Sequence, residues 1–123
     1  MLLCVIAAGK TTVLAATAFM LSWTHSVEKV EWREYWAVEG GKLRITESHV
    51  QGSGAGMEPP EGSVLEHGWW VYRPRLPPRE RLLLARSGAT GTGWRLCAAG
   101  ECIEIGGEGA SGPVEIRACE PPG

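Results

Sequence analysis

The sequence lacks the features of a membrane span, a secretory leader or a nucleic-acid surface. No apolar run approaches the roughly 20 residues that a spanning helix needs, because Lys10 and its neighbouring threonines interrupt the apolar N-terminal segment. That segment has no basic n-region, so it does not have the form of a signal peptide. Lysine and arginine are scattered and the formal net charge is −2, which argues against a nucleic-acid partner.

Cysteine is scarce, with only Cys4, Cys97, Cys102 and Cys119 in the chain. In an oxidising compartment these residues would allow several pairings. Because no secretory signal accompanies them, we expect free buried thiols, and we favour the cytoplasm over the periplasm as the compartment.

Helical periodicity is also missing. Seventeen glycines and eight prolines divide the chain into short pieces, and no apolar stripe with a period of about 3.6 residues is long enough for a sizeable helix. Alternation with period two is frequent instead, which indicates strands. The candidate strands are residues 2–7, 13–25, 31–38, 43–50, 69–73, 81–86, 94–97, 102–105 and 114–119. We expect one all-β domain over residues 1–123, an antiparallel sandwich or barrel of about eight short strands.

The stretch GWRLCAAGECIEI gives the clearest local signal. A loop from Ala98 to Glu101 would place Cys97 opposite Cys102 in a hairpin, with the large apolar residues on the other face. The two cysteines then lie within bridging distance on the solvent face. They are the disulfide candidate if the compartment is oxidising.

The stretch AAGKTT at residues 7–12 has the lysine and hydroxyl pattern that ends a phosphate-binding loop. That motif requires an earlier glycine at the position of Cys4, and without it the backbone cannot surround a phosphate. We therefore expect Gly9 and Lys10 to form a hairpin turn.

Three successive candidate strands carry polar residues on the face that should meet the core. Alternation puts Trp23 and His25 on the apolar face of their strand. If both connecting loops have four residues, the opposed pairs are Trp23 with Glu34, His25 with Trp32, Glu34 with Glu47 and Trp32 with His49. One end of this meander is then polar. The other end is apolar and contains Phe19, Leu21, Trp36, Val38, Leu43 and Ile45.

The polar end is the candidate ligand site. Two opposed carboxylates repel each other and are costly to bury without compensation. A protonated histidine, a nearby arginine, a shared proton, a bound cation or a cationic ligand would each compensate them, whereas a solvated strand end needs no ligand. Trp23 and Trp32 would form walls, and the loop from Ser53 to Gly56 would supply backbone donors.

Metal binding and catalysis are alternatives for the same residues. His25, Glu34, Glu47 and His49 suit zinc or another first-row metal by ligand type, but their spacing is not a recognised metal motif. A serine nucleophile is disfavoured because Ser26 points away from its neighbour His25 in a strand. We expect no bound cofactor.

The stretches WTHSVEK, LRITES, GSGAGMEPPEG, GWWVYR and LARSGATG resemble the bacterial family known as domain of unknown function 1850, over nearly the whole chain. Members of that family are encoded beside, or fused to, permeases of tripartite ATP-independent periplasmic (TRAP) transporters, in the subgroup that uses TAXI solute-binding proteins. The resemblance implies an accessory to solute uptake, with the permease or its solute-binding protein as partner. By this resemblance, the residues of the family motif are His25, Ser26, Glu34, Glu47, Gly54, Ala55 and Gly56. His49 is not part of that motif.

We therefore expect an accessory or small-ligand-binding module of such a transporter, without enzymatic activity. In the expected site, Glu34 and Glu47 bind a cation or an ammonium group and His25 orients or neutralises it. The site residues are Trp23, His25, Ser26, Trp32, Glu34, Glu47, Ser53, Gly54, Ala55 and Gly56. The alternative is an enzyme that uses His25, Glu34 and Glu47 as an acid–base or metal site on a small organic substrate.

Overall fold

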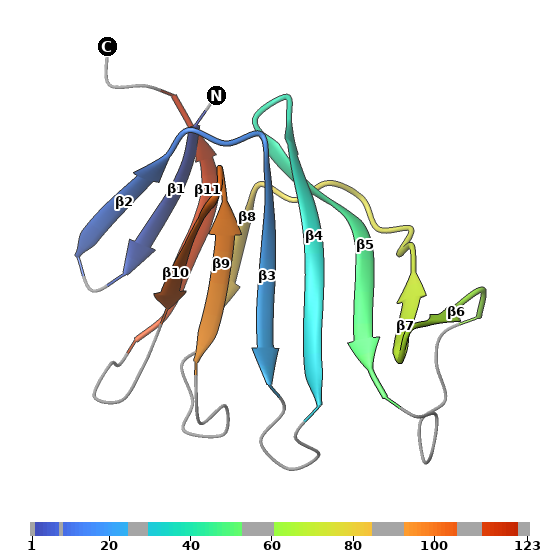
Figure 1. Cartoon of the computed structure of the whole chain (residues 1–123). Helices are drawn as coiled ribbons and strands as arrows, with labels where there is room; N and C mark the ends of the chain where they lie inside the picture. The colour runs from blue at the N-terminus through green and yellow to red at the C-terminus, as the bar shows by residue number, and fades with distance from the viewer. Residues whose placement is uncertain are drawn as a thin grey trace.

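Two antiparallel sheets form the fold in the computed structural model of the chain, which describes residues 2–7, 9–24, 30–52, 61–84, 93–105 and 112–120 (Figure 1). The small sheet has the order β2-β1-β11-β8, with β1 at Leu2–Ala7, β2 at Lys10–Leu14, β8 at Arg81–Leu84 and β11 at Val114–Cys119. The large sheet has the order β10-β9-β3-β4-β5-β7-β6. Its strands are β3 at Ala18–Thr24, β4 at Glu31–Glu39, β5 at Lys42–Gln51, β6 at Val64–Glu66, β7 at Trp69–Tyr72, β9 at Trp94–Ala98 and β10 at Glu101–Ile105.

The prediction of an antiparallel all-β sandwich is confirmed, and the sheets do not close into a barrel within the described ranges. The structure has eleven strands there, more than the predicted eight or so. One reason is a break in the predicted strand 13–25, where the Ala16 amide donates a hydrogen bond to the Leu14 carbonyl at 3.1 Å. The other is β6, which pairs with β7 and was missed because it is short and exposed.

Side chains from both sheets alternate into one hydrophobic core. Phe19 and Trp36 stack with ring centroids 6.2 Å apart. The core contains the apolar end of the predicted meander, as expected. Its buried residues are Leu3, Val5, Ala16, Phe19, Leu21, Trp36, Val38, Leu43, Ile45, Leu82, Trp94, Leu96, Ala98, Ile105, Val114 and Ile116. We call the side of the large sheet that meets this core its inner face and the opposite side its outer face.

Glycines close two of the hairpins. Gly40 and Gly41 join β4 to β5 with φ angles of 58° and 80°, the positive values that a type I′ turn requires. Gly9 joins β1 to β2 with a φ of 78°. The prediction of a hairpin turn in place of a phosphate loop is therefore confirmed at Gly9, whereas Lys10 already belongs to β2 and pairs with Ala7.

Strand β5 contains one residue more than its partner β4 at the position of Thr46. Trp36 pairs with Ile45 and Tyr35 pairs with Glu47, so Thr46 has no partner and forms a β-bulge. The Thr46 hydroxyl donates a hydrogen bond of 3.0 Å to the Tyr35 carbonyl.

The bulge reverses the alternation of side chains along β5. Before it, Leu43 and Ile45 are buried on the inner face; after it, Ser48 and Val50 are the buried residues, 3% and 2% exposed. Every side chain of β5 beyond Thr46 therefore lies on the face opposite to that predicted by simple alternation.

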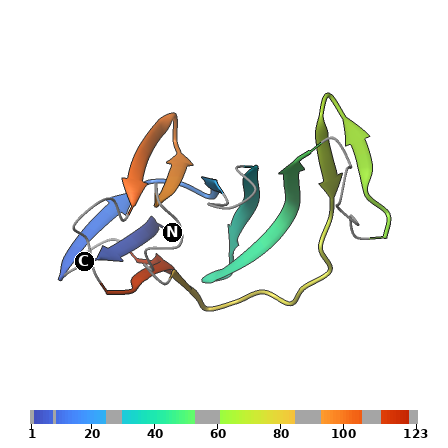
Figure 2. The same cartoon turned by 90° about the horizontal axis from the view of Figure 1, so that it is seen from below.

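The connection between β7 and β8, residues 73–80, crosses below β5 and β4 on the inner side of the large sheet (Figure 2). It is attached to β5 at one point. The Arg79 amide donates to the Leu43 carbonyl at 2.8 Å, and the Leu43 amide donates to the Arg79 carbonyl at 2.7 Å. The connection therefore holds its side chains over the inner face of β4 and β5.

Two disulfides are present, so the expectation of free thiols is wrong. Cys4 of β1 bonds to Cys119 of β11, because the strands from the two ends of the chain lie side by side. Cys97 bonds to Cys102 across the β9–β10 hairpin, as the candidate pairing predicted. No helix in the described ranges is long and apolar enough to cross a membrane.

Candidate functional site

Glu34 is the polar residue that the fold places on the inner face of β4. It pairs with Leu21 of β3 and with Ser48 of β5, and it lies two residues before Trp36 on the same face. The β7–β8 connection lies opposite this part of the inner face, since Leu76 lines pockets together with Glu34 and Ile45.

Two adjoining pockets lie between this part of the sheet and the connection, with volumes of about 310 Å³ and 470 Å³. Glu34, Ile45 and Leu76 line both of them, so the pockets meet at Glu34. We call the combined space the inner groove.

Arginines dominate the charge of the inner groove. Arg79 and Arg81 line the smaller pocket, and Arg73 and Arg75 line the larger one. The Arg81 guanidinium forms an ion pair with Glu115 at 3.2 Å. Glu34 and Glu61 are the acidic residues in the described lining, so positive charge predominates in a chain whose formal net charge is −2.

Burial raises the pKa of the Glu34 carboxyl above its ordinary value of 4.5, while the Trp36 indole and the charge of Arg79 oppose this shift. Desolvation disfavours the charged form, so the Glu34 carboxyl takes up a proton at a higher pH than an exposed glutamate does, and it can then donate a hydrogen bond. The Trp36 indole nitrogen is buried, and it lies close enough to the Glu34 carboxylate to oppose the shift. The groove therefore contains an acid whose charged form is disfavoured by burial and only partly stabilised by its neighbours.

Aromatic residues continue the inner face beyond Glu34. Trp23 and Trp32 pair directly and stack with centroids 6.1 Å apart. The indole nitrogens of Trp32 and Trp70 are buried without a partner in the part of the chain that the structure describes. Trp23 and Trp32 thus share the face of Glu34, as alternation predicted, but they lie beside the groove and outside its described lining.

The predicted pairing of the site residues is wrong at both strand contacts. Strands β3 and β4 are shifted by two residues, so Trp23 lies opposite Trp32, and Glu34 lies opposite Leu21. The connecting loop is longer than the four residues assumed, because the pairing ends at Thr24 and Glu31.

The second contact separates the two acids. The bulge at Thr46 turns Glu47 and His49 to the outer face, opposite Tyr35 and Arg33, while Glu34 lies opposite Ser48 on the inner face. Glu34 and Glu47 are therefore on opposite sides of the sheet and cannot bind one cation together.

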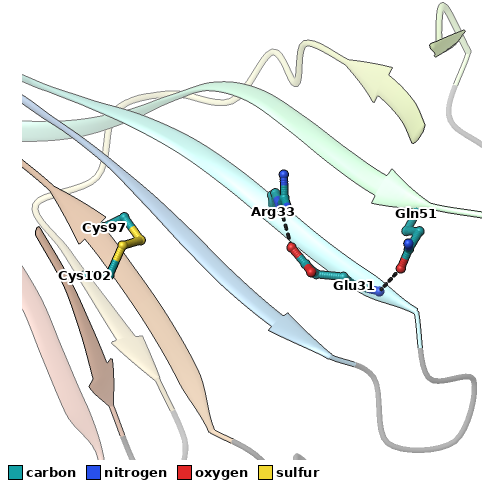
Figure 3. A network of polar contacts seen from close by, with 5 residues as sticks. All are labelled: Glu31, Arg33, Gln51, Cys97 and Cys102. Atoms are coloured by element: carbon teal, nitrogen blue, oxygen red, sulfur yellow. Dashed lines mark hydrogen bonds and ion pairs between the residues drawn. A yellow bond between two sulfur atoms is a disulfide. The ribbon is translucent and has the colours of Figure 1, made fainter. Parts of the chain in front are cut away.

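On the outer face these residues form a self-contained polar cluster. His49 lies 2.5 Å from a Glu47 carboxylate oxygen, and its ring is 4.8 Å from that of Tyr35. Arg33 stacks over Trp69 at 4.4 Å and forms an ion pair with Glu31, whose amide donates to Gln51 at 3.3 Å (Figure 3). The charges of this cluster compensate one another.

The proposed four-ligand metal set does not converge. Glu34 is separated by the sheet from Glu47 and His49, and the described ranges contain no group of three or more residues that could hold a metal ion. The remaining predicted site residues, which are His25, Ser26, Ser53, Gly54, Ala55 and Gly56, lie outside the described residues.

The arginines of the β7–β8 connection are the residues that sequence reasoning missed. The stretch RPRLPPRER places four arginines within nine residues. In the sequence this stretch only joins the candidate strands 69–73 and 81–86, and none of its residues was a candidate for the site. A concentration of one charge in a connecting segment was the available signal, since solvated charge of one sign in a loop often belongs to a binding surface.

Comparison with known proteins gives one family. The family model described as "Domain of unknown function (DUF1850)" matches residues 19–105 of the 123. The match includes β8 and the large sheet from Phe19 onward, and it leaves out β1, β2 and β11. It therefore contains every described residue that lines the inner groove. Neither a curated protein nor a solved structure matches the chain.

Proposed function

The chain belongs to the DUF1850 family, and we propose that it is a non-catalytic module that binds a small organic anion in the inner groove and serves a solute transporter of the TRAP type. One observation supports the ligand-binding part of this proposal. Two pockets meet at the half-buried Glu34, and four arginines, Arg73, Arg75, Arg79 and Arg81, line them.

The charge of the groove decides the class of ligand. The sequence predicted a cationic ligand because Glu34 and Glu47 were expected to face each other. The structure does not contain that pair, so this reason for a cation no longer holds. Guanidinium groups bind carboxylates through parallel charge-assisted hydrogen bonds. A small carboxylate therefore suits the described lining better than an ammonium ion does.

Arg79 and Glu34 would have distinct roles in binding. Arg79 is fixed by its two backbone hydrogen bonds to Leu43, so its side chain starts from a defined position. It would bind the ligand's carboxylate as an ion pair. Glu34, with its raised pKa, would donate a hydrogen bond to a carbonyl, hydroxyl or carboxyl oxygen of the ligand.

Calorimetric titration with mono- and dicarboxylates from acetate to citrate tests this proposal. We expect at least one compound to bind, and Arg79→Ala to weaken its affinity by about tenfold or more, the value of a charge-assisted hydrogen bond. Arg44→Ala is the matched control, because Arg44 pairs with Glu39 at the β4–β5 turn, away from the groove. Absence of binding by the whole panel, or equal binding by both variants, would contradict the proposal.

The transporter association rests on the family resemblance and gains support from the disulfides. Two disulfides are typical of an oxidising compartment such as the periplasm, in contrast to the cytoplasmic preference drawn from the sequence. Co-purification of the tagged chain with the permease encoded beside it is the direct test. Failure to retain either the permease or its solute-binding protein would remove this part and leave ligand binding untouched.

A raised glutamate pKa in a pocket is also the observation that favours an enzyme as the second candidate. Glu34 would then act as a general acid on the bound carboxylate compound. Glu47 takes no part, since it lies on the outer face. Product formation followed by NMR, and its loss in Glu34→Gln, would establish this alternative over simple binding.

A further inference from the structure

The two disulfides differ in how accessible they are. Cys97 and Cys102 face each other on the outer face of the large sheet, away from the core (Figure 3). Cys102 is exposed and Cys97 is half-buried, whereas Cys4 is only 7% exposed and Cys119 is half-buried. Cys102 is therefore the sulfur that an external thiolate reaches most readily.

They also differ in how much of the chain they constrain. Cys4 and Cys119 are 115 residues apart, while Cys97 and Cys102 are 5 apart. The stabilisation expected from limiting the unfolded chain grows with the length of the closed loop. The fold therefore depends on the long-range disulfide far more than on the hairpin disulfide.

The β9–β10 hairpin has its own means of closure. Ala99 and Gly100 form its two-residue turn with φ angles of 52° and 78°, both in the region that a type I′ turn requires. The strands pair along their whole length, from Trp94 with Ile105 to Ala98 with Glu101. Opening of the Cys97–Cys102 bond consequently leaves the hairpin paired.

A pocket of about 560 Å³ lies on the outer face beside this hairpin. Both Cys97 and Cys102 line it, together with Met20, Tyr35 and Ala37 from β3 and β4. Thiol–disulfide exchange requires access to one sulfur of the bond. The pocket provides this access without any movement of the core.

We propose that Cys97–Cys102 is a thiol–disulfide exchange site that reacts with dithiol reductants, while Cys4–Cys119 remains oxidised as a structural bond. A thiolate of the reductant attacks the Cys102 Sγ, the disulfide breaks, and the electron pair leaves on the Cys97 Sγ, which takes up a proton. The second thiol of the reductant then attacks the mixed disulfide and releases Cys102 as a thiol. The hairpin disulfide gains two electrons and two protons, and the dithiol becomes a disulfide.

Differential alkylation of the full oxidised chain tests this site without any substitution. The chain is equilibrated with graded dithiothreitol or with a reduced Cys-x-x-Cys protein, free thiols are alkylated, and the modified cysteines are identified by peptide mass spectrometry. We expect half-reduction of Cys97–Cys102 at a reductant excess about tenfold or more below that required for Cys4–Cys119. Simultaneous reduction, or earlier reduction of Cys4–Cys119, would overturn the proposal.

The two arms distinguish the sources of the dithiol. If both reductants reduce Cys97–Cys102, the site reacts with protein oxidoreductases as well as with small dithiols. If only dithiothreitol reduces it, the site reacts with small dithiols alone. A Cys-x-x-Ser variant of the reductant protein, which cannot complete the second step, should trap a mixed disulfide at Cys102. Trapping at Cys119 instead would contradict the assignment.

Paired variants provide the structural control. Cys97→Ala with Cys102→Ala should leave the Tm close to that of the wild type, because the hairpin closes by its turn and its backbone pairing. Cys4→Ala with Cys119→Ala should lower the Tm strongly. Equal losses in the two double variants would show that the hairpin disulfide is structural.

Discussion

The two halves of the β4–β5 hairpin are built from the same pair of strands and have different surroundings. Between the Gly40–Gly41 turn and the bulge at Thr46, the inner side chains are apolar and lie in the core. Beyond the bulge, the inner face carries Glu34 and Ser48 and borders the inner groove. One unpaired residue thus separates a half that stabilises the fold from a half that is free to carry polar groups, and substitutions should affect the two halves differently.

Insertion of one alanine between Glu47 and Ser48 should have the largest effect. With the added residue, Ser48 and Val50 would be driven to the outer face and His49 to the inner face, or the Leu43 side would be driven out of the core. We expect loss of the cooperative unfolding transition, measured by circular dichroism during heating.

Thr46→Val is the control for this insertion. It keeps the number of residues and removes only the hydrogen bond to the Tyr35 carbonyl, so it should cost about 1 kcal/mol. An insertion variant as stable as Thr46→Val would show that the faces of β5 beyond the bulge do not matter to the fold.

Leu43→Ala should lower the free energy of unfolding by about 3 kcal/mol, because a fully buried leucine leaves a cavity when truncated. Chemical denaturation measures the change. Leu76→Ala is the matched substitution in the groove, where the leucine is 57% exposed, and it should cost less than about 0.5 kcal/mol. Similar losses in the two variants would show that the connection over the groove contributes to stability as much as the core does.

Glu34→Gln should stabilise the free protein at neutral pH by a smaller amount. Burial raises the pKa of Glu34 in the folded state, so above that pKa the folded chain carries a charge that the unfolded chain holds more favourably in water. The gain should shrink as the pH falls through the raised pKa and should vanish below about 4.5, where the carboxyl is protonated in both states. Urea denaturation at several pH values measures it. Destabilisation at neutral pH would mean that the ionised form is the one that the fold stabilises.

Glu39→Gln, beside the turn, should show the smallest effect and the opposite sign. The Arg44 side chain lowers the pKa of Glu39 through a hydrogen bond and its charge. The carboxylate therefore contributes stability above its ordinary pKa, and this contribution is lost as the pH falls. Because the pair is fully exposed, the loss in Glu39→Gln should be slight and should diminish with added salt. Parallel pH profiles for Glu34→Gln and Glu39→Gln would contradict the assigned environments.

Alternation in the sequence was sufficient to predict the strands that line the core. Period-two patterns located the apolar residues of β3, β4 and the first half of β5. The hairpin residues Cys97 and Cys102 were paired correctly, although Ala98 and Glu101 of the predicted loop pair with each other and belong to the strands. The prediction that Trp23, Trp32 and Glu34 lie on the same face was also correct, because a register shift of two residues does not change the face of a side chain.

The predictions about the site that were wrong concerned features that leave no local pattern in the sequence. A bulge adds a residue that no composition marks, and Thr46 is an ordinary strand residue by its type. The pairing of Cys4 with Cys119 depends on two strands at opposite ends of the chain. The inner groove depends on the path of the β7–β8 connection over β4 and β5, which only the three-dimensional arrangement reveals.

The bulge also determines how sequences of relatives should be aligned through β5. A gap of a single position belongs at Thr46, because a gap placed elsewhere in β5 exchanges the faces assigned to the residues between that gap and the bulge. A relative that lacks the extra residue would keep its counterparts of Glu47 and His49 on the outer side by plain alternation. Loss of one codon at this position would thus remove the bulge and leave the residues that border the groove in place.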